Sequence, residues 1–197
     1  MRGAGAFLLD HRTSPRHRWS STALRYAIQM MLGVPVSGIP TSPAGACLYC
    51  RSEHESRGHH LFRCAKLRGA HTTRHNLVCK RLEPYLRRLF SCVQPEPYGL
   101  HPSVVHRPDF FLESNDGRKF VIDVVIVHPP IAPTATITNP AAVGAAARLG
   151  ADSKRRQYAG LDENLYRLVP FSMEACGFID SPAVRFLRDF ATSTSSY

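Results

Sequence analysis

The segment RPDFFLESNDGRKFVIDVVIV, residues 107–127, contains two apolar runs on either side of Asn-Asp-Gly at residues 115–117. This turn sequence between apolar runs is typical of a β-hairpin, so we expect residues 110–112 and 120–127 to pair as antiparallel strands. Asp123 lies inside the second run, where a carboxylate needs a cation, a hydrogen-bond donor or a raised pKa. The segment therefore predicts a small sheet that carries a buried acidic residue.

A second acidic residue, Asp109, lies as far before the turn as Asp123 lies after it. With Asp116 at the centre, the two carboxylates face each other across adjacent strands, with Cβ atoms roughly 4.5 to 5.5 Å apart. Such a pair can bind a divalent cation, Mg²⁺ or Mn²⁺. In the alternative interpretation Asp109 only begins a turn and Asp123 pairs with an arginine, either Arg107 or Arg118.

A lysine and a tyrosine favour the metal interpretation. Lys154 and Tyr158 are four residues apart, so they share one face of the helix that we expect from Pro140 to about Ala159. A lysine beside a metal-bound water can orient that water and stabilise a pentacovalent phosphate. The neighbouring Arg155 and Arg156 are expected to lie on the solvated face of this helix, where they would bind phosphates and take no part in catalysis.

Cysteines and histidines between residues 47 and 64 have the spacing of metal ligands. Cys47 and Cys50 are separated by two residues, and Cys64 follows His60 by four. Four such ligands can close a tetrahedral structural zinc site. His60 is preferred because one helical turn would align it with Cys64, and His59 is the substitute. The alternative is a reduced cysteine pair with surface histidines.

The composition limits the class of protein. The chain has 197 residues with a formal net charge of +10, which favours a polyanionic partner, nucleic acid before acidic membranes. No apolar run approaches the roughly 18 residues of a membrane span, and the six cysteines do not suggest a secreted disulfide framework. We therefore expect a soluble intracellular protein.

Helix and strand patterns alternate along the chain, which predicts an α/β (α+β) fold. Residues 1–20 are expected to be a flexible basic arm and residues 193–197 a polar tail. Between them we expect these elements: a helix over 22–32, a helix from Thr72 or Thr73 to about Phe90 with Val78, Leu82, Tyr85 and Leu89 in the core, a linker from Gln94 to Ser103, the hairpin, the helix from Pro140, a strand over 167–174, and a helix from Pro182 capped by Ser181.

Several short motifs occur in one order: Cys47-x2-Cys50, His60, Cys64, Arg74-His75-Asn76, Arg107-Pro108-Asp109, Ile122-Asp123-Val124, Lys154-x3-Tyr158 and Pro170-Phe171-x2-Glu174-x2-Gly177. From about Ala23 to Leu187 the chain resembles the C-terminal part of reverse transcriptases from non-LTR, LINE-type retrotransposons. The resemblance implies a zinc knuckle, within residues 21–70, before a restriction-like endonuclease of the PD-(D/E)xK type, residues 71–192. Its core would be a small mixed sheet flanked by helices. Such a nuclease nicks target DNA so that the 3′ hydroxyl primes reverse transcription.

The resemblance also implies roles for single residues. Asp109 and Asp123 would bind the catalytic metal, and Lys154 would replace the lysine usually found two residues after the second acid, where this chain has Val125. Other expected contributors are Tyr158, His75, Asn76 and, more weakly, Glu174 at the site, and Arg74, Arg107, Arg155 and Arg156 on DNA. Expected partners are DNA, RNA as an alternative, and a reverse transcriptase module, in the nucleus. The competing function is a non-catalytic nucleic-acid-binding module.

Overall fold

A computed structural model describes residues 20–32, 34–36, 45–53, 58–100, 107–128, 144–175 and 177–194. The chain divides into two compact units, each described here by itself. The first comprises Met1–Thr73, Pro130–Val143 and Cys176–Phe178, and the second comprises Arg74–Pro129, Gly144–Ala175 and Ile179–Tyr197. Apart from Ser20, the basic arm expected over residues 1–20 lies outside the described residues.

The first unit contains helix α1 (Ser21–Leu32), as the sequence predicts, and two short 3₁₀ helices, η3 (His59–Phe62) and η4 (Ala65–Leu67). Helix α1 starts where the Leu24 N–H donates to the Ser20 carbonyl at 2.9 Å. No helix among the described residues is long and apolar enough to cross a lipid bilayer.

The second unit is built on a four-stranded mixed sheet in the order β1-β2-β3-β4. The strands are β1 (Cys92–Pro95), β2 (Phe110–Glu113), β3 (Lys119–Val127) and β4 (Arg167–Glu174). The first two pairings are antiparallel and β3 pairs with β4 in parallel. The sequence predicted the hairpin and the bounds of β4, so the mixed α/β class is confirmed. The linker predicted from Gln94 was wrong at its start, because Gln94 and Pro95 belong to the edge strand β1.

The register of the hairpin follows from its turn. Phe110 pairs with Ile122 and Glu113 with Lys119, so the pairing is centred on residue 116, as predicted. The Ser114 N–H donates to the Arg118 carbonyl at 2.9 Å and closes the loop. Gly117 has a φ of 81°, a left-handed conformation that glycine adopts without strain, and its N–H donates to the Ser114 carbonyl at 2.9 Å to close the turn.

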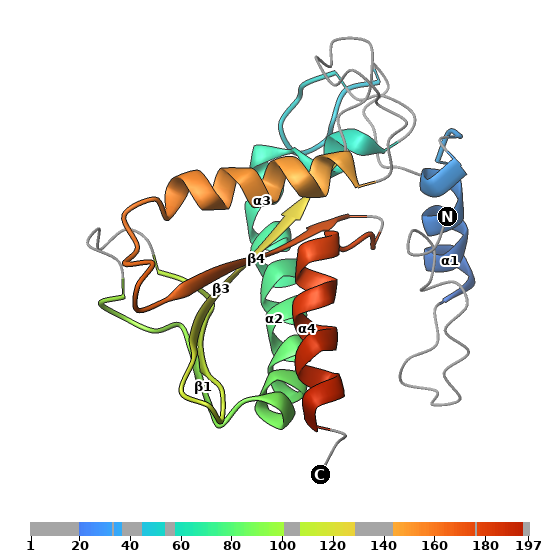
Figure 1. Cartoon of the computed structure of the whole chain (residues 1–197). Coiled ribbons are helices and arrows are strands. Elements are labelled where there is room, and N and C mark those ends of the chain that lie inside the picture. The colour runs from blue at the N-terminus through green and yellow to red at the C-terminus, as the bar shows by residue number, and fades with distance from the viewer. Residues whose placement is uncertain are drawn as a thin grey trace. The chain divides into compact units, whose positions relative to one another are not determined.

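Helices cover both faces of the sheet (Figure 1). Helix α3 (Ala145–Gln157) crosses one face, and α2 (Arg68–Leu89) and α4 (Ser181–Thr194) lie side by side on the other. Side chains alternate along β3: Phe120, Ile122 and Val124 join the core formed with α2 and α4. The intervening positions, among them Asp123, therefore face α3.

Aromatic rings fill the core beneath α4. The ring centroids of Phe90 and Phe190 are 4.6 Å apart, and those of Phe120 and Phe186 are 5.1 Å apart. Each ring removes a large apolar area from water, and edge-to-face pairs add roughly 0.5–1.5 kcal/mol beyond that burial. One predicted core residue was wrong: Tyr85 is 59% exposed, whereas Leu86 on the next position of α2 is fully buried.

Three helix starts differ from the sequence prediction. Helix α2 begins at Arg68, and the hydroxyls of Thr72 and Thr73 donate to carbonyls four residues earlier inside the helix instead of capping it. Helix α3 follows Gly144, and residues 139–143 lie outside the described part of the chain. Helix α4 begins one residue before Pro182, and it extends to Thr194, two residues into the expected polar tail.

Candidate functional site

Three cysteines and one histidine cluster in the first unit. The ligand atoms of Cys47, Cys50, His60 and Cys64 all lie within 4.8 Å of one another. Sγ of Cys50 is 3.1 Å from Nε2 of His60, and Sγ of Cys47 is 3.9 Å from Sγ of Cys64. Three sulfur ligands and one imidazole at such separations form a donor set that can hold a metal ion such as Zn²⁺.

A tight turn brings the first two cysteines together. The Arg51 N–H donates to the Cys47 carbonyl at 2.9 Å, and the Cys47 N–H donates to the Ser52 carbonyl at 2.8 Å. Arg51 adopts a φ of 64°, which is uncommon for a residue with a side chain. The backbone is thus folded back on itself so that Cys47 and Cys50 point into one cluster.

His60, and not His59, belongs to this cluster, as preferred from the sequence. Both histidines lie in the 3₁₀ helix η3, so the α-helical alignment assumed for His60 and Cys64 does not apply. Hydrogen bonds from Ser52 lower the pKa of Cys50 to about 6, whereas burial raises the pKa of Cys64. Since the thiolate is the ligating form, Cys50 is better prepared than Cys64 to bind a metal.

Asp109 and Asp123 come together in the second unit. Asp123 is 4% exposed, and burial raises the pKa of its carboxyl group, with the negative charge of Asp109 adding to the rise. Oδ2 of Asp109 accepts a hydrogen bond from the Val124 N–H at 2.6 Å. This bond fixes the Asp109 carboxylate against β3, beside Asp123, as the hairpin register predicts.

Helix α3 places Lys154 on Asp123. Nζ of the lysine lies 3.0 Å from Oδ1 and 3.1 Å from Oδ2 of the aspartate. The positive charge of Lys154 offsets part of the effect of burial, and the pKa of Asp123 remains raised. Tyr158, 3% exposed just after the helix, lies beside the same carboxylate, and burial followed by the charge of Asp123 raises the pKa of its phenol. Tyr158 therefore stays protonated and can act as a donor.

His75 on α2 reaches the group from the other face of the sheet. Its Nε2 atom is 3.2 Å from Oδ2 of Asp109 and 3.1 Å from the Val124 carbonyl oxygen. The hydrogen bond with Asp109 raises the pKa of His75 to about 11. Nδ1 of His75 is 3.4 Å from Oδ1 of Asn76, the other α2 residue expected at the site. His75 thus connects α2 to the carboxylate.

Two groups near this site were not predicted from the sequence. Cys79 lies one helical turn after His75, with Sγ 3.8 Å from Nδ1, and with His75 and Asp109 it forms a second set of atoms close enough to hold a metal. The Val124 carbonyl oxygen also points toward His75. The i, i+4 spacing of His75 and Cys79 could have revealed the first group. A backbone carbonyl has no sequence signal.

The arginines expected on DNA occupy different environments. Arg107 pairs with Glu96 at 2.6 Å and also contacts the Tyr98 hydroxyl, and Arg155 pairs with Asp152 at 2.5 Å. Arg74 is partly buried, and burial lowers its pKa. Arg156 is exposed. Neither arginine of the alternative interpretation binds Asp123, because Arg107 contacts Glu96 and Arg118 contacts Asp116.

Glu174 is not brought to Asp123. The residue opposite Asp123 on β4 is Pro170, and Glu174 pairs with Val127 at the far end of both strands. Four residues along a strand correspond to about 13 Å. Glu174 is buried there, which favours a structural role at the end of the sheet.

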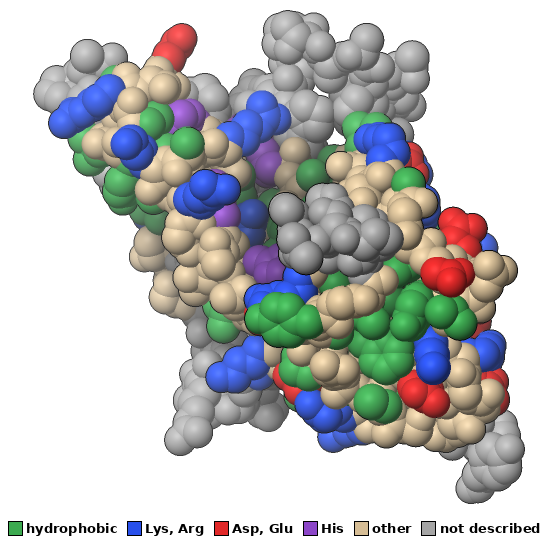
Figure 2. Space-filling model, turned by 90° about the vertical axis from the view of Figure 1, so that its left-hand side faces the viewer, with side chains coloured by type: hydrophobic (Ala, Val, Ile, Leu, Met, Phe, Trp, Pro, Cys, Tyr) green, Lys and Arg blue, Asp and Glu red, His purple; other side chains and the backbone are tan. Residues whose placement is uncertain are grey.

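No model of a known protein family matches the chain, and no curated protein sequence matches it. Charge alone does not locate a partner surface either. Lys and Arg side chains are spread over the face shown in Figure 2 instead of forming one patch. Function is therefore inferred from the two clusters of side chains and from the sequence resemblance.

Proposed function

We propose that the chain is a metal-dependent DNA endonuclease domain with a zinc knuckle, of the restriction-like kind carried by non-LTR retrotransposons. The observation that carries the proposal is the contact of Lys154 with Asp123, next to Asp109. Two acids and a lysine are the groups that define a PD-(D/E)xK site. A mixed sheet with helices on both faces supports a restriction-endonuclease-like core.

The donor atoms fit a hard divalent cation. Asp109 and Asp123 would hold Mg²⁺ or Mn²⁺, because carboxylate oxygens are the ligands that these ions prefer. Such a cation, when bound, lowers the pKa of a coordinated water and polarises the phosphate. The Lys154 ammonium group would orient the attacking water and stabilise charge on the phosphate, and Tyr158 would support the lysine. His75 fixes the Asp109 carboxylate.

The Cys47, Cys50, His60 and Cys64 cluster would hold a structural Zn²⁺. The cluster supplies four ligands, which would leave no open position for substrate, so this zinc would organise the fold of the first unit and not catalyse a reaction.

The proposed partner is DNA, with RNA as an alternative, and the net charge of +10 supports either one. In the proposed setting the nick primes reverse transcription by an associated polymerase module in the nucleus. Arg156, which is exposed on α3, would contact a phosphate of the substrate.

One observation favours a second function, a non-catalytic nucleic-acid-binding module. Both oxygens of Asp123 lie within hydrogen-bonding distance of Lys154, and Oδ2 of Asp109 is contacted by His75 and the Val124 N–H. The two carboxylates are thus compensated without a cation. In that case the zinc cluster and the basic surface would provide the whole activity.

A nicking assay separates the two functions. Supercoiled plasmid is incubated with the protein in Mg²⁺, in Mn²⁺ and in EDTA, and open circular product is measured. The endonuclease proposal expects nicking with either metal and none in EDTA. It also expects Asp123→Asn to bind DNA normally and not to cut, because the charge that holds the metal is lost while the size is kept. A wild-type protein that binds but does not nick supports the non-catalytic module.

A further inference from the structure

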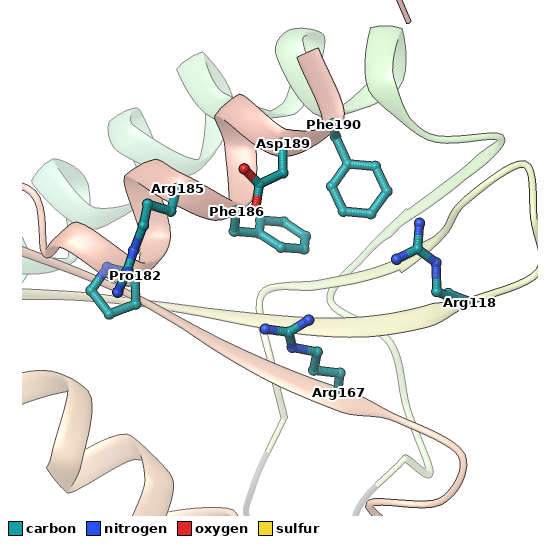
Figure 3. A pocket seen from close by; sticks show the side chains of 7 residues that line it. All are labelled: Arg118, Arg167, Pro182, Arg185, Phe186, Asp189 and Phe190. Atoms are coloured by element: carbon teal, nitrogen blue, oxygen red, sulfur yellow. The ribbon is translucent and has the colours of Figure 1, made fainter. Parts of the chain in front are cut away.

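A pocket of about 460 Å³ lies between the start of β3, the start of β4 and helix α4 (Figure 3). Three arginines line it: Arg118 directly before β3, Arg167 on β4 and Arg185 on α4. Its remaining wall includes two core rings, Phe186 and Phe190, and a single acidic residue, Asp189. The pocket is therefore cationic at its rim and apolar at its base.

This pocket and the acidic site are on opposite faces of the sheet. Arg167 pairs with Phe120 and lies two residues before Val169, and Phe120 and Val169 both belong to the core under α4. Because side chains two residues apart share a face, Arg167 points to the α4 side. Asp123 faces α3, so changes in the pocket leave the contact between Asp123 and Lys154 untouched.

Two of the three arginines carry charge that no acidic side chain in the described part of the chain neutralises. Arg167 and Arg185 form no ion pair among the described residues, and both are exposed. Arg118 does pair with Asp116, and its guanidinium group lies 5.2 Å from the ring centroid of Phe190. That stacking holds Arg118 at the edge of the pocket. The pocket is thus lined by two guanidinium groups without an ion pair among the described residues, by Arg118 and by one carboxylate, that of Asp189.

We propose that this pocket binds a segment of single-stranded nucleic acid. Guanidinium groups bind phosphate oxygens in a bidentate manner, which suits Arg167 and Arg185 to successive phosphates. A volume of about 460 Å³ is within the usual range for small-ligand pockets and accommodates one nucleotide. An unpaired nucleobase can enter the pocket and lie against its apolar floor or the Arg118 guanidinium plane. The nucleobases of a duplex cannot enter, because they are stacked inside the double helix. The proposal does not depend on cleavage.

Binding of a fluorescent single-stranded oligonucleotide at several salt concentrations tests it. The variant Arg167→Gln/Arg185→Gln removes two phosphate contacts, so the slope of log K against log salt should fall by about 1.4 and affinity at 0.1 M salt by about 25-fold. The matched control is Arg81→Gln/Arg88→Gln, which removes two exposed arginines from α2. The control should change the slope by less than half as much. Equal effects of the two variants would mean that binding depends on the net charge of the protein and not on this pocket, which would overturn the proposal.

A gain of affinity gives an independent measurement. Asp189→Asn removes the one negative charge of the pocket and should tighten single-strand binding several-fold, while the exposed Glu163→Gln should leave it unchanged. Duplex DNA of the same length and vesicles containing phosphatidylserine form the other arms. Both pocket variants should change the affinity for duplex DNA less than the affinity for the single strand. A pocket effect that is larger on duplex or on vesicles than on the single strand would reject the proposed ligand.

Discussion

Nζ of Lys154 lies 3.0 Å from Oδ1 of Asp123, although 31 positions separate the two residues. The lysine comes from α3 and the aspartate from the middle of β3. A lysine two residues after Asp123 on the same strand would start on the same face; here that position is Val125. Helix α3 therefore provides the positive charge, on Lys154, that β3 lacks at position 125.

Removing the lysine should affect stability and cleavage separately. Lys154→Met leaves the buried Asp123 carboxylate unpaired, which should lower the free energy of unfolding by about 3 kcal/mol. Asp123→Asn/Lys154→Met should recover most of that loss, because no unpaired charge remains. Neither variant should nick DNA. Urea unfolding together with the plasmid assay measures both effects.

Lys154→Arg refines this test. It keeps the charge but changes the donor geometry. Partial nicking would indicate phosphate stabilisation by charge, and no nicking would point to a specific contact with water. Cleavage by Asp123→Asn at the wild-type rate would contradict the proposed site altogether.

Gly150 permits α3 to pack closely against the sheet, which brings Lys154 to Asp123. A Cβ atom at this position would lie 2.6 Å from Oγ of Ser172 and 2.9 Å from Cγ2 of Val127. Gly150→Ala should therefore push α3 away from the sheet, cost about 1–3 kcal/mol of stability and reduce nicking more than DNA binding. Gly69→Ala is the matched control, because nothing lies within 4 Å of its added Cβ and alanine favours helix. Thermal unfolding of the two variants should move in opposite directions.

The sequence predicted the parts of this fold that local patterns encode. The turn at residues 115–117 set the hairpin register, and the apolar run of β4 was found with its correct bounds. The role of Gly150 has no local signal, because it depends on Ser172 and Val127 across the packing interface. Edge strand β1 was missed since its Gln94-Pro95 sequence is typical of a linker.

The candidate sites show the same division. Spacing brought out Cys47, Cys50, His60 and Cys64, and symmetry about the turn brought out Asp109 and Asp123. The ion pairs of Arg107 and Arg155, by contrast, depend on partners such as Glu96 that only the folded chain defines. The pocket under α4 had no local pattern, because its arginines are far apart in the sequence.

His75 should remain protonated well above neutral pH. The hydrogen bond with Asp109 raises the pKa of His75 from 6.5 to about 11. A raised pKa means that protonation stabilises the fold: this contribution is complete below pH 6.5 and is lost as the pH rises through 11. NMR of the imidazole nitrogens at pH 8 should show the doubly protonated ring in the wild type. In Asp109→Asn the same ring should titrate at a clearly lower pH, with only Cys79 left to raise its pKa; an unchanged titration would assign the shift to another group.

The purified protein should contain about one zinc ion per chain, held by three thiolates and His60. His60→Ala removes a ligand and should lower the zinc content at equilibrium with a chelator, whereas His59→Ala should retain it, because His59 is outside the cluster. Both variants remove an imidazole from the same 3₁₀ helix and should disturb its structure to a similar extent. A difference in zinc content between them therefore reports on ligation. Substituting Co²⁺ and recording its d–d and sulfur charge-transfer bands identifies the ligand set. Equal zinc loss in the two variants, or a cobalt spectrum unaffected by His60→Ala, would reassign the fourth ligand.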